Sequence, residues 1–192
     1  EKIAVGAGLP KNIIDLDKSI EKNIESISEA KNTSPNKLSA CILKRPRHQK
    51  IIDTLKSLGV KINYISDGDV SGVISVALTN SKNDIYIGTG GAPEGVLAAA
   101  ALDCLNCQMQ TRLVFQNDAE KIKAKNLGIT ELDKKYNIPD MIKSDVIFCA
   151  TGVTSGDLVK GIKEDGIFFV AETLVLHKST KMKEIIINKL KK

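Results

Sequence analysis

The sequence predicts an α/β fold, a layered α/β/α arrangement around a mostly parallel sheet that is mixed at its edge. Short apolar runs alternate along the chain with segments that carry apolar residues at helical spacing. Hydrophobic residues make up 42% and charged residues 27% of the 192 residues, which is typical of globular proteins. Because no repeat or low-complexity linker divides the chain, we expect one α/β domain over residues 1–192.

Strands and helices are expected in alternation along most of the chain. The expected strands are short apolar or alternating runs, at residues 38–43, 60–65, 84–87, 145–150, 167–176 and 182–187. The expected helices lie at residues 17–30, 47–58, 69–79, 95–105, 118–125 and 155–163. Asp17 is the expected N-cap of the first helix, and Gly59 is expected to end the second. Residues 112–115 are expected to be extended.

Charge and cysteine content narrow the class of protein. The net charge of +5 is spread along the chain, without the basic stripe and aromatic groups of a nucleic-acid binder. Cys41 and Cys149 lie in apolar runs and are expected to be buried. Cys104 and Cys107 form a C-x-x-C pair, for which packing is favoured over a redox or metal site. No run approaches the ~20 apolar residues of a membrane span, and no signal peptide is apparent.

Three places where an expected strand leads into a helix carry unusual chemistry, and ligands of open α/β sheets bind outside the carboxyl ends of strands. The first is Lys-Arg-Pro-Arg-His at residues 44–48. Arg45 and Arg47 lie near a helix N-terminus that Pro46 can begin. Guanidinium groups and free backbone N–H groups together suit phosphate, and a solvated basic turn is the alternative.

The second place is Ser-Asp-Gly-Asp at residues 66–69. Gly68 lets the chain bend between Asp67 and Asp69. This pair of carboxylates can bind a cation, orient sugar hydroxyls or cap the next helix. Capping explains Asp69 well and Asp67 less well.

The third place, residues 88–95, has four glycines in eight positions, which allow backbone N–H groups to approach a phosphate closely. It lacks the Lys-Ser/Thr of a P-loop, and Pro93 stands where a dinucleotide fingerprint has its third glycine. Glu94 would repel a phosphate there unless a metal lies between them. Glu94 is therefore a candidate ligand of Mg²⁺ or Mn²⁺, and a first-turn Glu favoured by the helix dipole is the alternative.

Together, a basic anion site, an acidic turn and a glycine loop with one carboxylate suit a phosphorylated polyol. Residues 151–154 follow the last expected parallel strand, and their hydroxyls can line the same cleft. Capping of the next helix by Thr154 or Ser155 is the favoured interpretation of that segment.

On these residues the sequence resembles the C-terminal portion of the class II fructose-1,6-bisphosphatases, a mainly bacterial family. The order and spacing fit over nearly the whole chain, and the sharpest match is Gly-Gly-Ala-Pro-Glu-Gly at residues 90–95. The other matching segments are residues 1–6, 45–48, 67–70, 109–110, 112–113, 145–148, 150–154 and 172–173.

The resemblance implies the layered α/β sugar-phosphatase fold. It also implies a cytoplasmic homo-oligomer that uses Mg²⁺ or Mn²⁺ to hydrolyse the 1-phosphate of fructose 1,6-bisphosphate in gluconeogenesis. By matching positions it implies that Glu94 binds metal. The residues it implies to bind the substrate are Arg45, Pro46, Arg47, Asp67, Gly68, Asp69 and Gly91.

One departure from the family is large. In the family a preceding region supplies most metal-binding carboxylates, including an Asp-Pro-x-Glu-Gly-Thr loop, and no Asp-Pro dipeptide occurs in this sequence. Because Mg²⁺ needs several ligands, we expect this chain to be the substrate-binding half of the enzyme, without the N-terminal metal-binding half and inactive alone. Two alternatives stay open: sedoheptulose 1,7-bisphosphate as the substrate, and a non-catalytic sugar-phosphate-binding module.

Overall fold

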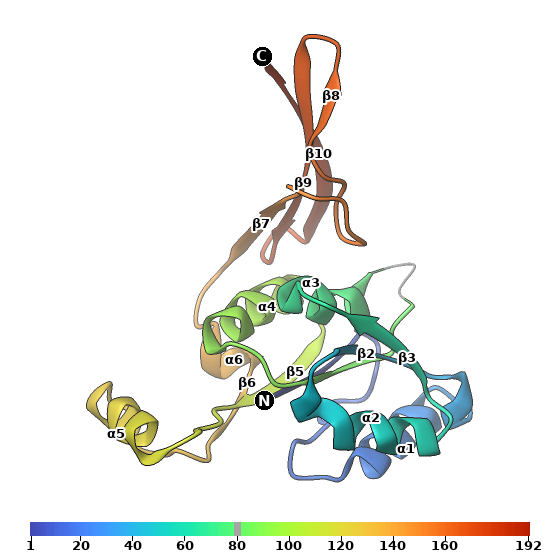
Figure 1. The fold of residues 1–192 in the computed structure, drawn as a ribbon, viewed down its shortest axis with the longest axis vertical. Coiled ribbons are helices and arrows are strands. Elements are labelled where there is room, and N and C mark those ends of the chain that lie inside the picture. The colour runs from blue at the N-terminus through green and yellow to red at the C-terminus, as the bar shows by residue number, and fades with distance from the viewer. Residues whose placement is uncertain (79–81) are drawn as a thin grey trace.

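The computed structural model describes residues 1–78 and 82–192 and contains two β-sheets with helices between and around them (Figure 1). The larger sheet contains β1 (Lys2–Val5), β2 (Ser39–Leu43), β3 (Lys61–Ile65), β4 (Ile85–Gly88), β5 (Gln108–Arg112) and β6 (Lys135–Asn137). The smaller sheet contains β7 (Ile147–Thr151), β8 (Lys163–Asp165), β9 (Phe168–His177) and β10 (Met182–Lys191).

The described α-helices are α1 (Ile20–Ala30), α2 (Gln49–Ser57), α3 (Asp69–Ile74), α4 (Ala92–Cys104), α5 (Asp118–Asn126) and α6 (Ile138–Met141). The same described ranges contain three 3-10 helices, namely η1 (Pro35–Lys37), η2 (Pro46–His48) and η3 (Ser75–Ala77). Over the described ranges, none of the helices has both the length and the apolar character needed to cross a membrane.

The larger sheet has the strand order β3-β2-β4-β1-β5-β6. β2 pairs in parallel with β3 and β4, whereas β1 is antiparallel to β4 and β5, and β6 is antiparallel to β5. Most of the described strands of this sheet, β2, β3, β4 and β5, therefore point the same way. This confirms an α/β fold with a mixed, mostly parallel sheet. The expected place of the mixing is corrected, because β1 runs against its neighbours inside the sheet and not only at its edge.

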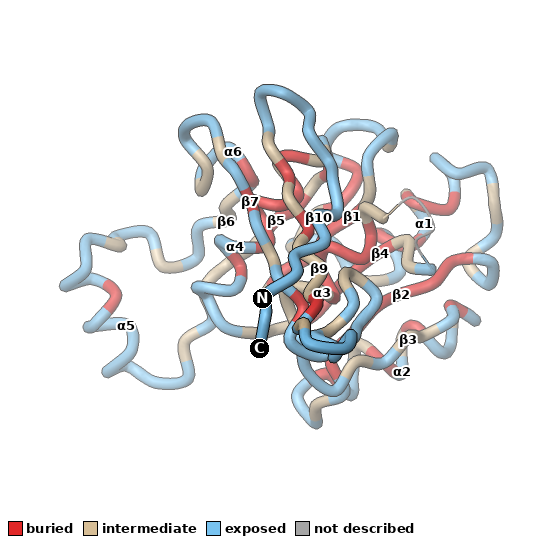
Figure 2. The backbone as a smooth tube through the Cα atoms, turned by 90° about the horizontal axis from the view of Figure 1, so that it is seen from above, coloured by how far each residue is buried: buried red, intermediate tan, exposed pale blue. Residues whose placement is uncertain are grey.

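Alternating side chains of the strands pack against helices on both faces of the larger sheet. On one face, Ile3 and Ile42 share a buried cluster with residues of α1 and α2. On the other face, Ala4, Cys41 and Tyr86 share a cluster with residues of α3 and α4. Figure 2 shows the buried residues gathered along the central strands, with mostly exposed residues in the outlying α5 segment. The expected α/β/α layering is thus confirmed.

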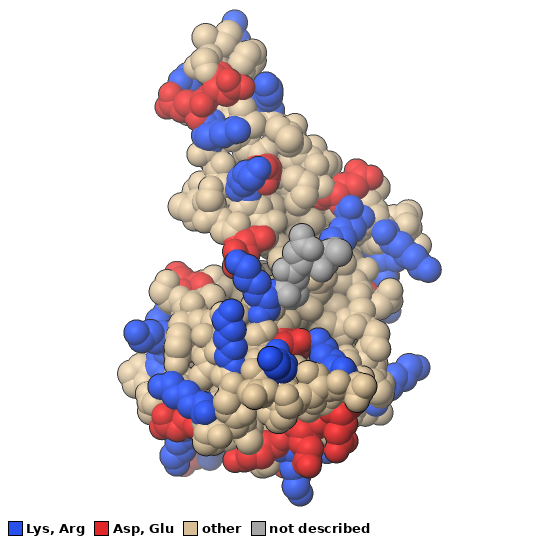
Figure 3. Space-filling view, turned by 90° about the vertical axis from the view of Figure 1, so that its right-hand side faces the viewer, with Lys and Arg blue, Asp and Glu red and all other residues tan. Residues whose placement is uncertain are grey.

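The smaller sheet adds a fourth layer on the far side of α3 and α4. Its order is β10-β9-β7, β8 also pairs with β9, and all of these pairs are antiparallel. Phe148, Leu174 and Leu176 are buried in one cluster with Ile74 of α3 and Ala101 of α4. In the space-filling view of Figure 3 this sheet rises above the rest of the molecule and shows mainly uncharged surface below a charged tip. The strand expected at residues 145–150 therefore exists as β7, but it is not parallel.

The prediction of a helix at residues 155–163 is wrong. The Gly156 N–H donates to the Val159 carbonyl at 3.0 Å, and the Ile162 N–H donates to the Val153 carbonyl at 3.2 Å. These bonds fold the segment into turns that lead into β8, so neither Thr154 nor Ser155 caps a helix. Glycines at positions 156 and 161 disfavour a helix there.

Other expectations are corrected at the ends of elements. Ser19, not Asp17, caps α1, since its Oγ accepts from the Lys22 N–H at 3.3 Å. The extended segment expected at residues 112–115 lies mostly after the end of β5. The last residue of the helix expected at residues 69–79 falls outside the described residues. Cys149 is exposed, because it lies on the outward side of β7, whereas Cys41, Cys104 and Cys107 are buried and free.

Gly72→Ala tests the close packing of α3 on the larger sheet. A Cβ at Gly72 would lie 2.5 Å from Ile65 Cδ1 and 3.2 Å from Tyr86 Cε2, and overpacking typically costs about 1–3 kcal/mol. Gly95→Ala is the matched control, since Gly95 is also helical and a Cβ there meets open space. We expect urea unfolding to show Gly72→Ala less stable than Gly95→Ala by about 1–3 kcal/mol, and equal stability would contradict this packing.

Candidate functional site

The three places singled out in the sequence meet at one edge of the larger sheet. They follow β2, β3 and β4, which are adjacent in the order β3-β2-β4 and run parallel. The Lys44 N–H donates to the Ile65 carbonyl at 2.9 Å, which joins the first loop to the second. The predicted substrate and metal residues therefore come from neighbouring loops at the carboxyl ends of parallel strands, where open α/β sheets bind ligands.

Arg47 joins the first loop to the glycine loop. Its Nε and Nη2 both donate to the Thr89 carbonyl, at 3.1 and 2.6 Å, while the side chain stays exposed. This contact fixes one edge of the guanidinium and leaves Nη1 available to a ligand. Arg45 is half-buried and donates from Nη1 to the Lys44 carbonyl at 3.2 Å. Pro46 begins η2, as expected for a first-turn proline.

His48 forms a second bridge beneath Arg47 and is only 1% exposed. Its Nδ1 lies 2.7 Å from the Leu43 carbonyl, and its Nε2 accepts from the Thr89 N–H at 2.8 Å. A carbonyl can only accept and an amide N–H can only donate, so this geometry requires the neutral ring with its proton on Nδ1. A Cβ at Gly88 would lie 3.2 Å from His48 Cε1, so any side chain at this position would crowd the ring.

Asp69 is held from two sides beneath the glycine loop. Oδ2 forms an ion pair with the Lys2 ammonium, and Oδ1 accepts from the Tyr86 hydroxyl. The Lys2 and Asp69 side chains are 2% and 11% exposed. Burial, and then the bond to Asp69, raises the pKa of Tyr86 well above its usual value, so its hydroxyl stays a donor. A Cβ at Gly90 would lie 2.1 Å from Asp69 Oδ2, which places this carboxylate directly against the loop.

The two carboxylates of the acidic turn, those of Asp67 and Asp69, therefore have different roles. Gly68 precedes α3 with φ +78°, a left-handed conformation that suits glycine. Asp67 is exposed, and among the described residues its Oδ1 accepts from the Gly68 N–H at 2.9 Å while Oδ2 has no hydrogen-bond partner, so that oxygen can serve a ligand. The capping interpretation of Asp69 is wrong, because α3 has no side-chain cap and Asp69 turns to Lys2 and Tyr86.

Glu94 lies in the first turn of α4 and bends back over Gly91, the residue that precedes the helix. A Cβ at Gly91 would lie 2.0 Å from Glu94 Oε2. Over residues 1–78 and 82–192, the described contacts give the exposed Glu94 carboxylate no hydrogen-bond or ion-pair partner. This carboxylate fits the role of one ligand of a divalent cation.

The rest of a metal site is not formed by the described residues. Among them, no group of three or more His, Cys, Asp or Glu side chains is placed to hold a metal ion. Because Mg²⁺ needs several oxygen ligands, Glu94 alone does not make a magnesium site.

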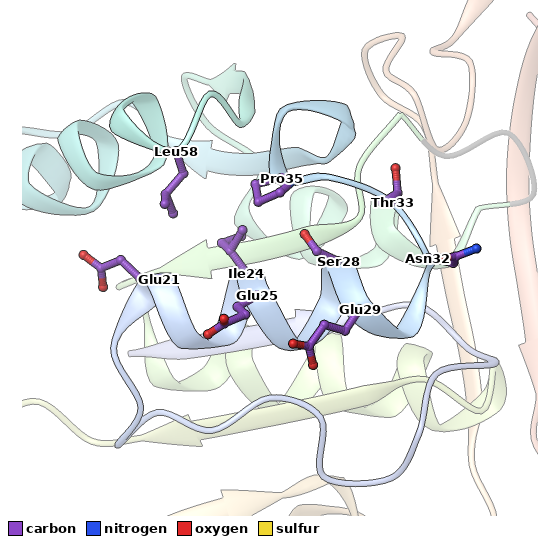
Figure 4. Close-up of a pocket in the computed structure, with 9 residues that line it drawn as sticks. All are labelled: Glu21, Ile24, Glu25, Ser28, Glu29, Asn32, Thr33, Pro35 and Leu58. Atoms are coloured by element: carbon purple, nitrogen blue, oxygen red, sulfur yellow. The ribbon is translucent and has the colours of Figure 1, made fainter.

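Of two surface cavities formed by described residues, one adjoins the predicted site and the other does not. One of about 390 Å³ lies beside the glycine loop and is lined by Lys2, Gly90, Gly91, Arg112 and Tyr136, among others. A larger one of about 590 Å³ follows α1 and contains none of the predicted site residues. Figure 4 shows its acidic rim along the helix, with Pro35 and Leu58 opposite. The cavity at the glycine loop is the one that adjoins a predicted binding residue, Gly91.

Lys2, Tyr86 and His48 are the residues that sequence reasoning missed. For Lys2, the local sign is its position in a short apolar run at residues 2–5, since a lysine that is buried there needs a partner for its charge. Tyr86 carries no such sign, and His48 stands in the basic segment 44–48 without an expected role of its own. The fourth place, residues 151–154, is not brought to these loops. Thr151 lies in the smaller sheet, where its hydroxyl bonds that of Thr173 at 2.9 Å.

Comparison with known proteins agrees with this geometry. A family model described as bacterial fructose-1,6-bisphosphatase, glpX-encoded, matches residues 1–189. The chain is 35% identical over 190 residues to fructose-1,6-bisphosphatase class 2 of Haemophilus influenzae. It is 37% identical over 190 residues to fructose-1,6-bisphosphatase 1 class 2 of Escherichia coli K12. Each match covers 92% of this chain and 56% of the relative, so the chain spans little more than half the length of these relatives.

Proposed function

Because the chain belongs to the bacterial, glpX-encoded fructose-1,6-bisphosphatase family, we propose that it is the substrate-binding part of a metal-dependent sugar-bisphosphate phosphatase. The complete protein would hydrolyse the 1-phosphate of fructose 1,6-bisphosphate to fructose 6-phosphate, a step of gluconeogenesis in the cytoplasm. The observation that carries this proposal is the meeting of a guanidinium, an accessible carboxylate and a glycine loop at the ends of β2, β3 and β4.

Each of these groups has a task that suits a phosphorylated sugar. Arg47, with one edge of its guanidinium fixed on Thr89, offers its other donors to a phosphate. Asp67 accepts a hydrogen bond from a sugar hydroxyl with its open oxygen. Gly91 lets the phosphate approach the N-terminus of α4, where backbone N–H groups and the helix dipole favour an anion. The chain thereby binds and orients the substrate, which is a large part of the work in phosphoryl transfer.

Glu94 would supply one ligand to Mg²⁺ or Mn²⁺, and this chain alone does not complete that site. When bound, such ions stabilise charge on the transferring phosphoryl group and activate water. We propose that the further ligands come from the share of the relatives' length that this chain does not span. We also propose that the complete protein assembles as a homo-oligomer.

Phosphate release tests the proposal. We expect a version of the protein as long as its relatives to release inorganic phosphate from fructose 1,6-bisphosphate with Mg²⁺ or Mn²⁺, and the 192-residue chain to release none. Activity of the 192-residue chain would contradict the incomplete metal site. A long form that is silent on fructose and sedoheptulose bisphosphates alike would contradict the phosphatase proposal and favour a binding module. Faster turnover of sedoheptulose 1,7-bisphosphate would instead correct the substrate.

A further inference from the structure

The cavity along α1 has a row of carboxylates on one side and apolar side chains on the other (Figure 4). Glu21, Glu25 and Glu29 follow one another at every fourth residue, and all three are exposed. Because an α-helix rises about 1.5 Å per residue, neighbouring members of this row lie about 6 Å apart along the helix. The cavity of about 590 Å³ therefore has an elongated negative side.

The protein does not compensate these carboxylates. Within the part of the chain that the structure describes, none of the three forms an ion pair. Carboxylates four residues apart on a helix repel each other. Glu29 also lies in the last turn of α1, where no basic residue offsets the negative end of the helix dipole. A chain with a net charge of +5 thus keeps uncompensated negative charge along this cavity, which favours a cation there.

Ser28 gives a second, independent indication of a ligand. It is only 5% exposed, and its Oγ has no hydrogen-bond partner among the described residues. Ser26 on the same helix instead donates to the Lys22 carbonyl at 2.9 Å, a common bond of helical serines. Figure 4 shows the Ser28 hydroxyl pointing from α1 toward Pro35, into the cavity. Since buried hydroxyls are normally bonded, a polar group of a ligand in this cavity would complete Ser28.

The shape of the cavity decides between kinds of cation. Among the described residues, no three His, Cys, Asp or Glu side chains converge to hold a metal ion, so the row of carboxylates does not suit a single Mg²⁺. Ile24, Pro35 and Leu58 give the cavity its apolar side, on which methylene groups can pack away from water. The matching ligand is a methylene chain with ammonium groups at intervals, and each ammonium can donate to carboxylates and to a hydroxyl.

We propose that the cavity along α1 binds a linear aliphatic polyamine. Its ammonium groups pair with the row of glutamates, one of them also donates to the Ser28 hydroxyl, and its methylenes pack on the apolar side. This site is separate from the loops after β2, β3 and β4, because no residue of those loops lines the cavity. The polyamine site does not depend on phosphate release, so it stands or falls independently of the proposed function.

Calorimetric titration of the 192-residue chain with spermidine tests the site, beside titrations with n-butylamine and Mg²⁺. Salt at about 0.15 M screens charges that are far from the cavity. We expect one spermidine per chain, bound roughly tenfold or more tightly than n-butylamine, because a monoamine lacks the further charge-assisted hydrogen bonds. If n-butylamine or Mg²⁺ binds as tightly as spermidine, the proposal of an extended polyamine site is wrong.

Two double variants separate a site from diffuse attraction. Glu25→Gln/Glu29→Gln should weaken spermidine binding by roughly tenfold or more. Asp118→Asn/Glu120→Gln removes the same charge from exposed positions of α5 and should leave the affinity unchanged. An equal loss in both variants, or a loss in neither, would overturn the proposal.

Ser28→Ala tests the buried hydroxyl. Because this hydroxyl has no partner among the described residues, its removal should not lower the midpoint of urea unfolding measured without spermidine. The same variant should bind spermidine more weakly, whereas Ser26→Ala should bind it like the wild type, since Ser26 bonds to its own helix. A lower midpoint or an unchanged affinity of Ser28→Ala would overturn the proposal, because the hydroxyl would then bond to the protein or not contact the ligand.

Discussion

Arg47→Met in a protein of the relatives' length should raise KM for fructose 1,6-bisphosphate by roughly 10- to 100-fold. Hydrogen bonds to charged groups are worth about 1.5–3 kcal/mol, and about 1.4 kcal/mol corresponds to a factor of ten. The effect should be large because Thr89 already fixes one edge of the Arg47 guanidinium, at 3.1 and 2.6 Å. A phosphate bound to the other donors would not have to order the side chain.

Arg47→Lys should recover only part of this loss, since an ammonium keeps the charge but cannot hold Thr89 and a phosphate with one planar group. Lys50→Met is the matched control, because Lys50 is an exposed cation on the same helical segment, and its KM should stay at the wild-type value. Steady-state kinetics over a range of substrate concentrations measures all three. An Arg47→Met protein with unchanged KM would remove Arg47 from the binding site.

Lys2→Met should lower the free energy of unfolding by about 3–5 kcal/mol, the usual cost of leaving one member of a buried ion pair alone. Lys2 and Asp69 are almost fully buried, and the remaining Asp69 oxygen already accepts from Tyr86. The uncompensated carboxylate would lie beneath Gly90, against the loop that we propose to hold the phosphate.

The double variant Lys2→Met/Asp69→Asn should recover part of the stability, because it removes the isolated charge. Lys61→Met is the control, since Lys61 is an exposed lysine on β3 and such surface changes are usually within about 0.5 kcal/mol. Urea unfolding of the four proteins decides the matter. Equal stability of Lys2→Met and Lys61→Met would mean that the ion pair does not hold the loop.

Local patterns predicted much of this fold because they depend only on neighbours in the sequence. The apolar run at residues 38–43 and the alternating run at residues 60–65 became β2 and β3, and Gly59 ends its helix with φ +74°. The three loops were also predictable, because clusters of Arg, Asp and Gly after buried strands are a local signal. Their meeting in space followed once β2, β3 and β4 were adjacent.

Long-range pairing is what the sequence did not reveal. Apolar content shows that residues 2–5 are buried but not that β1 runs antiparallel between β4 and β5. The Lys2–Asp69 ion pair joins residues that are 67 positions apart. The helix predicted at residues 155–163 was wrong for a related reason. Backbone hydrogen bonds that fold this segment into turns before β8 outweighed a weak helical pattern.

The proposed binding site is tested most directly by amide chemical shifts of the isotope-labelled 192-residue chain during titration with fructose 1,6-bisphosphate. At 20.8 kDa the chain suits such spectra. Because binding needs the loops and not the completed metal site, we predict the largest shifts at residues 44–48, 67–69 and 89–95, and their loss in Arg47→Met. Shifts confined to the cavity along α1, or no shifts at all, would contradict a sugar-phosphate site at the ends of β2, β3 and β4.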